Sequence, residues 1–329
     1  LKTIIMAAGE GTRMKSNKSK VLHKLLNREI IKYVVDASRF DESQTTIIGG
    51  KNKDDLNKIF PDDIIIEQKI GKDYPYGTGY AASLALNEIS DNDQVLVLNG
   101  DIPLITKSSL EEFISNHIEN DNSASVLSTK VKNPINYGRI IRDDSGDFIG
   151  IVEHKDLKLN QDIINEINTG IYIFKGSDLK LALSKLDTNN EQSELYLTDC
   201  IEILYNDGKK VMAFTASDPD EFYGINNKKE LAEAKKILQK RVNENHMLNG
   251  VVIEDPEMAI IDPEVIIGKD TIVSGPVKIL GKSEIGENCT IEGSSRIEDS
   301  ILKDNIKIDN SVIEKSFLDE GTDVGPYSH

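Results

Sequence analysis

The sequence contains no tryptophan, only two cysteines, and aromatic residues that make up 5% of its 329 positions. Cys200 and Cys289 lie far apart, without the spacing of a metal-binding pair. Two isolated cysteines exclude a dense disulfide framework and are most simply free thiols in a reducing compartment. We therefore expect a cytoplasmic protein.

Long apolar runs and an excess of positive charge are also missing. No stretch approaches the roughly 18 apolar residues of a membrane span, and the N-terminus lacks a signal-peptide pattern. Lys and Arg number 39 against 56 Asp and Glu, which gives a formal net charge of -17. Broad nucleic-acid binding requires a basic face, so we expect neither nucleic acid nor membrane as a partner.

Positive charge is nevertheless concentrated at the front of the chain. Residues 1–28 contain seven Lys and Arg and one acid, Glu10, a local charge of +6 (seven minus one). These cations follow an apolar stretch, residues 4–8, that breaks at Gly9 and Gly11. A strand, a glycine turn and clustered cations suit a polyphosphate, because glycine lets backbone N–H groups approach the oxygens. The alternative is an ordinary strand-turn-helix with a basic surface.

The first two-thirds of the chain alternates β-branched runs with helical patterns. We expect strands at 3–8, 45–49, 64–67, 94–98, 124–130 and 168–174, and helices at 54–60, 78–88, 108–119 and 177–186. This alternation predicts a Rossmann-like α/β domain whose mostly parallel sheet is covered on both faces. Ligands of such sheets bind beyond the carboxyl ends of the strands, where the turns after Ala8 and Leu98 fall.

The pattern changes after residue 227. Residues 228–248 place Leu231, Ala234, Leu238 and Val242 on one stripe of an amphipathic connecting helix. Aliphatic residues then recur every six positions, which predicts a short left-handed parallel β-helix of hexapeptide repeats. The repeating positions are Ile261, Ile267, Val273, Ile279, Ile285, Ile291 and Ile297, and, after an offset of nine, Ile306, Val312, Leu318 and Val324.

The predicted organisation is thus an α/β domain at 1–227, a connecting helix at 228–249 and a partial β-helix at 250–329. Because coils of this kind tend to stack side by side, we expect a homotrimer formed through the β-helix.

The glycine turn does not match the common nucleotide fingerprints. A dinucleotide-binding motif needs a third glycine where Met14 stands, and an acid about twenty residues further on, for which Asp36 is poorly spaced. A Gly-Lys-Thr phosphate loop is absent as well. Arg13 and Lys20 remain as the distinctive groups, able to neutralise charge on a phosphoryl group.

Asp101 follows the apolar run 95–98 directly, within an Asn-Gly-Asp turn. A carboxylate at the carboxyl end of a strand can hold Mg²⁺, which usually takes one or two protein oxygens. The alternative is a turn aspartate that bonds its own backbone. Polar groups beside the glycines at 138 and 170, and near Glu153, suit a sugar pocket, although each alone is more often turn chemistry. His154 has no partner at metal spacing, which favours a structural role.

Several motifs, taken together and in order, resemble those of a known family. They are Met6-Ala7-Ala8-Gly9-Glu10-Gly11-Thr12-Arg13-Met14, Lys20-Val21-Leu22-His23, Gly77-Thr78-Gly79, Gly100-Asp101-Ile102-Pro103-Leu104, Tyr137-Gly138-Arg139-Ile140, Val152-Glu153-His154-Lys155-Asp156, Glu166-Ile167-Asn168-Thr169-Gly170, Tyr196-Leu197-Thr198-Asp199 and Gly224-Ile225-Asn226-Asn227. The first two resemble the signature of sugar-phosphate nucleotidyltransferases. The whole set resembles the bacterial N-acetylglucosamine-1-phosphate uridyltransferases, the N-terminal half of a bifunctional enzyme.

The resemblance implies a function and a set of site residues. The enzyme would join UTP and N-acetylglucosamine 1-phosphate into UDP-N-acetylglucosamine and pyrophosphate, for cell-wall precursor synthesis, with Mg²⁺ as cofactor. By resemblance, the residues for the nucleotide are Ala7, Ala8, Gly9, Gln68, Gly77 and Thr78, and those for the sugar are Gly138, Glu153, Asn168 and Thr169. The resemblance also assigns magnesium to Asp101 and Asn226 and catalysis to Arg13 and Lys20.

The sequence departs from the family pattern at three places. The family's usual proline before the lysine is Ser19 here, which should loosen that loop. Residues 69–76 form a longer run than usual between Gln68 and Gly77. The chain stops at His329, before the later coils that carry the family's acetyltransferase site, and we expect no acetyl transfer.

Three other interpretations stay open at this point. The chain could be a nucleotidyltransferase for another sugar 1-phosphate, a dinucleotide-binding oxidoreductase, which Met14 disfavours, or a non-catalytic trimeric scaffold.

Overall fold

A computed structural model of the protein describes residues 1–71, 74–158, 160–187 and 194–329. The chain forms two compact units. The first contains residues 1–23 and 29–228, and the second contains residues 24–28 and 229–329. The second unit therefore includes a short N-terminal segment, which the sequence pattern does not anticipate.

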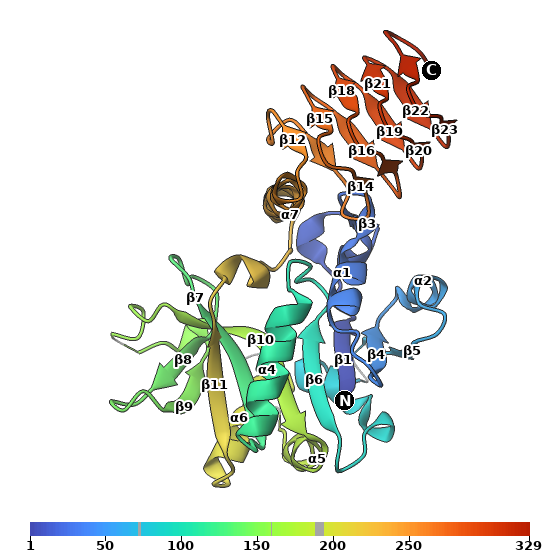
Figure 1. The fold of residues 1–329 in the computed structure, drawn as a ribbon. Helices are drawn as coiled ribbons and strands as arrows, with labels where there is room; N and C mark the ends of the chain where they lie inside the picture. The colour runs from blue at the N-terminus through green and yellow to red at the C-terminus, as the bar shows by residue number, and fades with distance from the viewer. Residues whose placement is uncertain (72–73, 159, 188–193) are drawn as a thin grey trace. The chain divides into compact units, whose positions relative to one another are not determined.

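The first unit is built on a nine-stranded mixed sheet (Figure 1). Its central order is β11-β7-β10-β6-β1-β4-β5, and β8 and β9 extend from β10. The strands are β1 (Lys2–Ala7), β4 (Gln44–Gly49), β5 (Ile64–Glu67), β6 (Gln94–Asn99), β7 (Ala124–Lys130), β8 (Arg139–Arg142), β9 (Phe148–Val152), β10 (Glu166–Lys175) and β11 (Val211–Ala216). Strands β6, β1, β4 and β5 run parallel, as do β7 and β11, while β10 is antiparallel to both β6 and β7.

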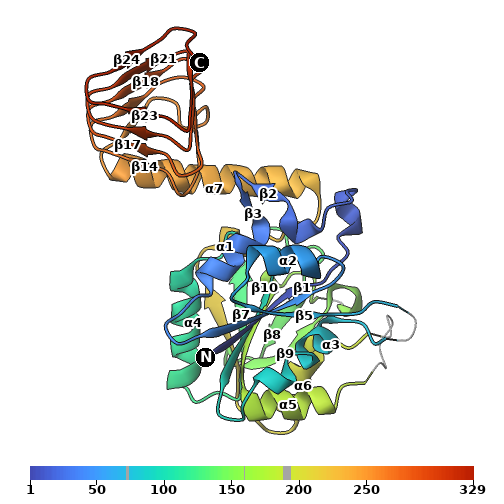
Figure 2. The same cartoon turned by 90° about the vertical axis from the view of Figure 1, so that its right-hand side faces the viewer.

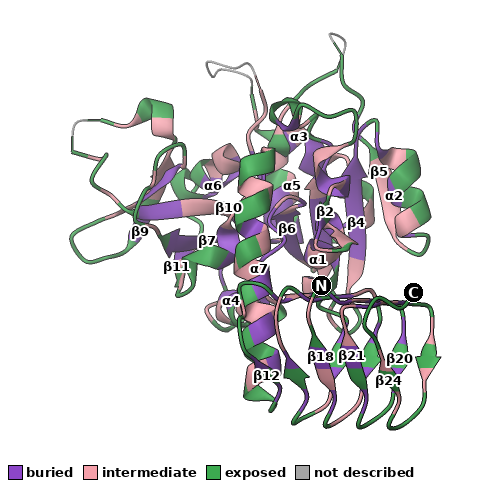
Figure 3. Cartoon of the chain, turned by 90° about the horizontal axis from the view of Figure 1, so that it is seen from above, coloured by how far each residue is buried: buried purple, intermediate pink, exposed green. Residues whose placement is uncertain are grey.

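Helices cover both faces of this sheet (Figure 2). The helices are α1 (Ile30–Ala37), α2 (Lys53–Ile59), α3 (Thr78–Ser83), α4 (Lys107–Glu119), α5 (Gly176–Ser184) and α6 (Leu197–Asn206). Helices α3, α5 and α6 pack on one face, and α1, α2 and α4 on the other. Ile4 and Ile5 of β1 show the alternation that produces the two cores, since neighbouring strand residues point to opposite faces. The central strands are buried (Figure 3).

The six strands expected from sequence all form, and the prediction of a sheet covered on both faces is confirmed. The sequence reasoning missed β8, β9, β11, α1 and α6. The case of α1 is instructive, because its sequence, IIKYVVDA, is rich in residues that favour strands. It forms a helix whose Ile30, Ile31, Val34 and Val35 are all buried, so the packing of one face outweighs local preference. The expected helix at 78–88 ends at Ser83 and is followed by a 3₁₀ turn, Leu86–Glu88.

Helix α7 (Lys228–Leu248) has the bounds that the sequence predicts. Its buried side differs from the expected stripe, because Gln239 and Asn243 are buried while Leu238 and Val242 are only half-buried. The reason is that polar side chains on this side of the helix form hydrogen bonds, some of them to the backbone of the segment that follows. The Asn243 amide nitrogen donates to the carbonyl oxygens of Pro256 and Ala259 at 2.7 and 3.0 Å, and Asn243 Oδ1 accepts from Gln239 Nε2 at 3.0 Å.

Short parallel strands then wind into a left-handed β-helix with three faces (Figures 1 and 2). The strands are β12 (Val252–Ile253), β13 (Ile260–Ile261), β14 (Ile266–Ile267), β15 (Ile272–Val273), β16 (Lys278–Leu280), β17 (Glu284–Ile285), β18 (Thr290–Glu292), β19 (Arg296–Glu298), β20 (Ile301–Leu302), β21 (Lys307–Asp309), β22 (Val312–Glu314), β23 (Phe317–Leu318) and β24 (Asp323–Val324). Each strand pairs with the third strand after it, so three strands complete one coil. A separate two-stranded ladder joins β2 (Lys24–Leu25) and β3 (Arg28–Glu29).

The second part of the predicted hexapeptide repeat is confirmed at Leu318 and Val324, which pair with the inward Leu302 and Ile308 and pack against the core. It is wrong at Val312, which is the outward partner of Arg296, while its neighbour Ile313 points inward, and Ile306 is buried two residues before the inward Ile308. The pairing distance falls from 18 residues (Lys278 to Arg296) to 16 (Arg296 to Val312), because some turns are one residue shorter. The strict period of six therefore ends at Ile297.

No helix in the described part of the chain is long and apolar enough to cross a membrane.

Candidate active site

A cavity of about 210 Å³ lies at the carboxyl ends of the adjacent parallel strands β1 and β6. Eight of the site residues expected from sequence line it: Ala7, Ala8, Gly9, Lys20, Gln68, Gly77, Thr78 and Asp101. This is the edge of the sheet at which ligands of open α/β sheets bind. The structure thus brings all six expected nucleotide-contacting residues together with one expected catalytic residue and one expected metal ligand.

The glycine turn is shaped by close approach to the segment that carries Lys20. Gly11 has φ 59°, and a Cβ atom there would lie 2.7 Å from Lys20 Cβ. A larger residue would therefore be strained and would push the two segments apart. Met14, which stands where a dinucleotide motif has its third glycine, is only 1% exposed. Its side chain anchors the turn in the core.

Four polar side chains form a cluster beside this cavity. The Lys20 ammonium group donates a hydrogen bond to the Asp101 carboxylate and another, of 3.1 Å, to Asn226 Oδ1. Arg13 Nη2 donates to the same Asn226 oxygen at 3.0 Å. Asn226 is distant in sequence, and a hydrogen bond of 2.9 Å from the Ile225 N–H to the Asp101 carbonyl holds its loop in place.

The carboxylate and amide oxygens of this cluster are the kind of ligand that a magnesium ion prefers. Asp101 and Asn226 both direct oxygen atoms at one cation, the Lys20 ammonium group. Hard divalent cations select oxygen ligands, and Mg²⁺ commonly takes one or two from protein and the rest from phosphates and water. No group of three or more His, Cys, Asp or Glu with metal-binding geometry occurs among the described residues.

Gly77 and Thr78 are held against the segment that precedes α6. Gly77 has φ 116°, and a Cβ atom there would lie 2.3 Å from the Leu195 carbonyl oxygen, so only glycine fits. The Thr78 hydroxyl accepts a hydrogen bond of 3.0 Å from the Leu197 N–H. Gln68 is buried, and its N–H donates to the Gly49 carbonyl at 2.7 Å.

Three of the four residues expected for the sugar lie together. The Asn168 N–H donates to the Gly138 carbonyl at 2.9 Å, and both Glu153 carboxylate oxygens lie 3.4 Å from where a Gly138 Cβ would be. Burial raises the pKa of Glu153, and the nearby Asp156 adds to the rise. The Thr169 hydroxyl instead donates to the Leu127 carbonyl at 2.6 Å, at the bulge between β10 and β7. The structure therefore gives the Thr169 side chain a bond within the sheet.

The orientation of the Asn168 amide is fixed from both ends. Its nitrogen donates to the Tyr172 hydroxyl at 2.8 Å, and its oxygen accepts from the Gly170 N–H at 3.0 Å. Tyr172 is buried, and burial raises the pKa of its hydroxyl. The hydroxyl therefore stays protonated. The Gly170 carbonyl also accepts from Asn99 Nδ2 at 3.4 Å, which links this region to a residue of the cavity wall.

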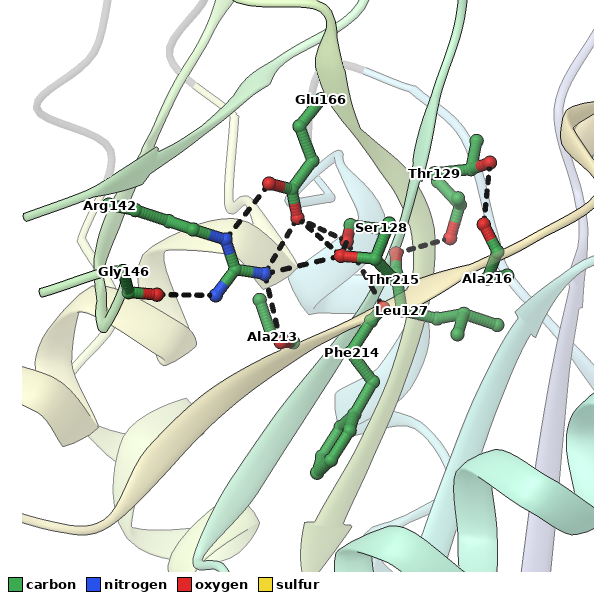
Figure 4. A network of polar contacts seen from close by, with 11 residues as sticks. Leu127, Ser128, Thr129, Arg142, Gly146, Glu166, Ala213, Phe214, Thr215 and Ala216 are labelled. Carbon is green, nitrogen blue, oxygen red and sulfur yellow. Dashed lines mark hydrogen bonds and ion pairs between the residues drawn. The ribbon is translucent and has the colours of Figure 1, made fainter.

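An ion pair supports the start of β10, two residues before Asn168 (Figure 4). Arg142 donates to both oxygens of Glu166, at 2.9 and 2.7 Å. Ser128 and Thr215 donate to Glu166 Oε1 at 2.6 and 3.0 Å. Burial acts to raise the pKa of Glu166, but the bonds from Arg142 and Ser128 outweigh it and lower the pKa. The network connects β7, β8, β10 and β11, and so stiffens the sheet under the expected sugar residues.

Sequence reasoning missed several residues of the cavity wall, among them Tyr76, Asn99 and Glu194. Two of these residues could have been found from the sequence, because Asn99 begins the Asn-Gly-Asp turn and Tyr76 directly precedes Gly77. No sequence feature points to Glu194. A larger cavity, of about 440 Å³, also borders the glycine turn and is lined by only Ala8 and Gly9 of the expected residues.

Comparison with known proteins gives one family. Residues 2–240 match the model of the nucleotidyl transferase family. The bifunctional protein GlmU of Clostridioides difficile (strain 630) is 43% identical over 329 residues, which are 100% of this chain and 71% of that protein. The bifunctional protein GlmU of Thermoanaerobacter pseudethanolicus is 39% identical over 100% of this chain and 71% of its own. That of Lactobacillus johnsonii is 41% identical over 99% of this chain and 70% of its own.

Proposed function

The chain belongs to the nucleotidyl transferase family and, within it, to the GlmU proteins, and we propose on this basis that it makes UDP-N-acetylglucosamine. The substrates are UTP and N-acetylglucosamine 1-phosphate, and the second product is pyrophosphate. The observation that carries the proposal is the single cavity lined by eight expected residues, with Arg13 and Asn226 joined to it through Lys20.

The reaction requires positioning and positive charge more than acid–base catalysis. An oxygen of the sugar phosphate forms a bond to the α-phosphorus of UTP, while the bond from that phosphorus to the departing pyrophosphate breaks on the opposite side. The sugar phosphate is already anionic near pH 7, so no side chain has to remove a proton. The difficulty is the repulsion between two anions, which fixed cations and exact alignment reduce.

The cluster at the cavity supplies these cations. Arg13 and Lys20 bind phosphate oxygens and neutralise the charge that develops on the α-phosphoryl group. Asp101 and Asn226 would hold Mg²⁺, which supplies further neutralisation of the phosphates when bound. Asn226 also keeps Arg13 and Lys20 close together, since its Oδ1 accepts from both.

The remaining residues divide between the two substrates. Ala7, Ala8, Gly9, Gln68, Gly77 and Thr78 contact the uridine nucleotide along the cavity wall. Gly138, Glu153 and Asn168 bind the amino sugar, with Thr169 holding the bulge from which Asn168 projects. The Asn99–Gly170 hydrogen bond joins the two regions.

The β-helix also has an outward apolar row that suits a homotrimer. Ile266, Ile301 and Phe317 occupy corresponding outward positions on one face and are 62%, 40% and 60% exposed. Glu284 is the polar member of the same row. Two further copies of this chain would cover these side chains, and the mass in solution from light scattering tests this assembly.

A pyrophosphate-release assay with UTP, Mg²⁺ and N-acetylglucosamine 1-phosphate tests the function. We expect release only when all three are present. Glucose 1-phosphate, galactosamine derivatives and other nucleoside triphosphates, each supplied separately, identify the preferred substrates. Efficient turnover of another sugar phosphate alone would contradict the proposed sugar, and no turnover of any would contradict the enzyme.

A further inference from the structure

A buried asparagine ties together three segments behind the glycine turn. Asn52 is 7% exposed and lies just before α2. Its amide nitrogen donates to the Ala7 carbonyl at 3.1 Å and to the Ser19 hydroxyl at 3.0 Å. Its oxygen accepts from the Gly50 N–H at 2.8 Å. Both donor hydrogens of the amide are thus used, one on the end of β1 and one on the residue before Lys20.

Ser19 has a backbone conformation that a proline would also adopt. Its φ and ψ are -54° and 142°, within the range that a proline ring imposes. Among the residues that the structure describes, none accepts a hydrogen bond from the Ser19 N–H. Ser19 also borders the cavity of about 440 Å³. Within the ranges that the structure describes, Ser19 thus has neither a proline ring nor a hydrogen bond from its N–H to restrain it. The hydrogen bond between its hydroxyl and the Asn52 amide restrains it instead.

We propose that Asn52 is a positioning residue, which fixes Lys20 through Ser19 and the nucleotide-facing Ala7–Ala8 backbone through the Ala7 carbonyl. This inference rests on the proposed function for its effect on catalysis. The physical reason is that Lys20 follows Ser19 directly and reaches Asp101 and Asn226 from the backbone position that Ser19 sets. A displacement of about 1 Å at such a group can reduce a rate by about 100-fold.

The decisive variants are Asn52→Ala and the double variant Ser19→Pro/Asn52→Ala. Asn52→Ala removes the tie, and we expect kcat to fall by about 10- to 100-fold, while the KM values change less. Ser19→Pro then restricts residue 19 by its ring, independently of Asn52. We expect it to raise the kcat of the Asn52→Ala protein by about fivefold or more. Asn57→Ala, at an exposed asparagine within α2, is the matched control and should leave kcat unchanged.

A second measurement is independent of activity. Amide hydrogen exchange of the free protein over residues 13–22 reports the mobility of the loop directly. We expect faster exchange in Asn52→Ala and slower exchange again in Ser19→Pro/Asn52→Ala. If the wild-type protein released no pyrophosphate, the proposed function would fail, and the exchange experiment would still decide the role of Asn52. Unchanged exchange in Asn52→Ala, or a double variant that regains less than fivefold in kcat, overturns the proposal.

Discussion

Lys20 and Asp101 form an ion pair in which the ammonium group donates to the carboxylate. A metal ion at Asp101 therefore has to share this carboxylate with a cation that belongs to the protein. The ion pair lies at a cavity wall and is partly shielded from solvent. How strongly a metal ion competes with Lys20 for this carboxylate then depends on the negative charge of Asp101.

Asp101→Asn should raise the Mg²⁺ concentration needed for half-maximal turnover by at least about tenfold, because a neutral amide is a weaker ligand. The variant keeps the size of the side chain, and so the turn should stay intact. Initial rates measured across a Mg²⁺ titration give the value. An unchanged Mg²⁺ dependence would remove Asp101 from the proposed metal site.

Arg13→Ala should reduce kcat by about 100-fold or more if Arg13 acts mainly on the transition state. Its guanidinium is exposed and bonds Asn226, so its removal should have little effect on stability. Lys107→Ala, which deletes an exposed cation on α4, serves as the charge-matched control. A near-normal kcat in Arg13→Ala would show that this arginine is not catalytic.

Tyr172→Phe should raise the KM for the sugar phosphate by about fivefold and leave the KM for UTP unchanged, since the lost hydrogen bond is worth about 1 kcal/mol. The cause is the loss of the hydroxyl that orients the Asn168 amide. Steady-state kinetics with each substrate varied in turn separates the two constants. Tyr205→Phe, at a half-exposed tyrosine, is the control. Equal increases in both KM values would indicate a general structural defect.

Arg142→Met should lower the free energy of unfolding by about 2–4 kcal/mol, because it leaves the Glu166 carboxylate buried without its charged partner. Arg142→Met/Glu166→Gln should be more stable than Arg142→Met, since the uncompensated charge is gone. Urea denaturation at pH 7 measures both. A double variant no more stable than Arg142→Met would show that packing, and not charge, explains the loss.

His117 should make stability depend on pH between about 4 and 6.5. Burial and, to a smaller extent, Lys175 lower its pKa to about 4 against the opposing effect of Asp121, while Ser125 and Gln94 bond the two ring nitrogens. The neutral ring is therefore favoured in the folded state. Its contribution is fully present above pH 6.5 and is lost as the pH falls toward 4, by about 2–3 kcal/mol.

Unfolding free energies of wild-type protein and His117→Asn, measured from pH 4 to pH 7, test this dependence. The slope should be smaller in His117→Asn. His329→Asn, at an exposed histidine, should retain the wild-type slope. Equal slopes in all three proteins would contradict the assignment to His117.

The sequence was most informative where a residue has a local reason for its identity. Gly11 and Gly77 are required by positive φ and close contacts, and both belong to motifs visible in the sequence. Helix α1 was missed because its β-branched residues favour a strand locally, and only tertiary packing decides otherwise. Asn52 gave no signal either, since its role arises from two partners, Ala7 and Ser19, that lie 45 and 33 residues away.

The shift in the β-helix repeat has a similar cause. Local spacing predicts an inward residue every six positions, but the length of each turn is set by the coil as a whole. Asp299, Asn310 and Lys315 adopt positive φ in turns that separate inward residues by five positions. A pattern read from aliphatic residues alone cannot distinguish Val312, which points outward, from Ile313, which points inward.

A crystal structure with UDP-N-acetylglucosamine and Mg²⁺ tests the central claim most directly. The account predicts the uridine in the cavity beside Gln68 and Gly77, the diphosphate within hydrogen-bonding distance of Arg13 and Lys20, and the metal on Asp101. A nucleotide sugar bound elsewhere, with this cluster of cations facing only solvent, would contradict it.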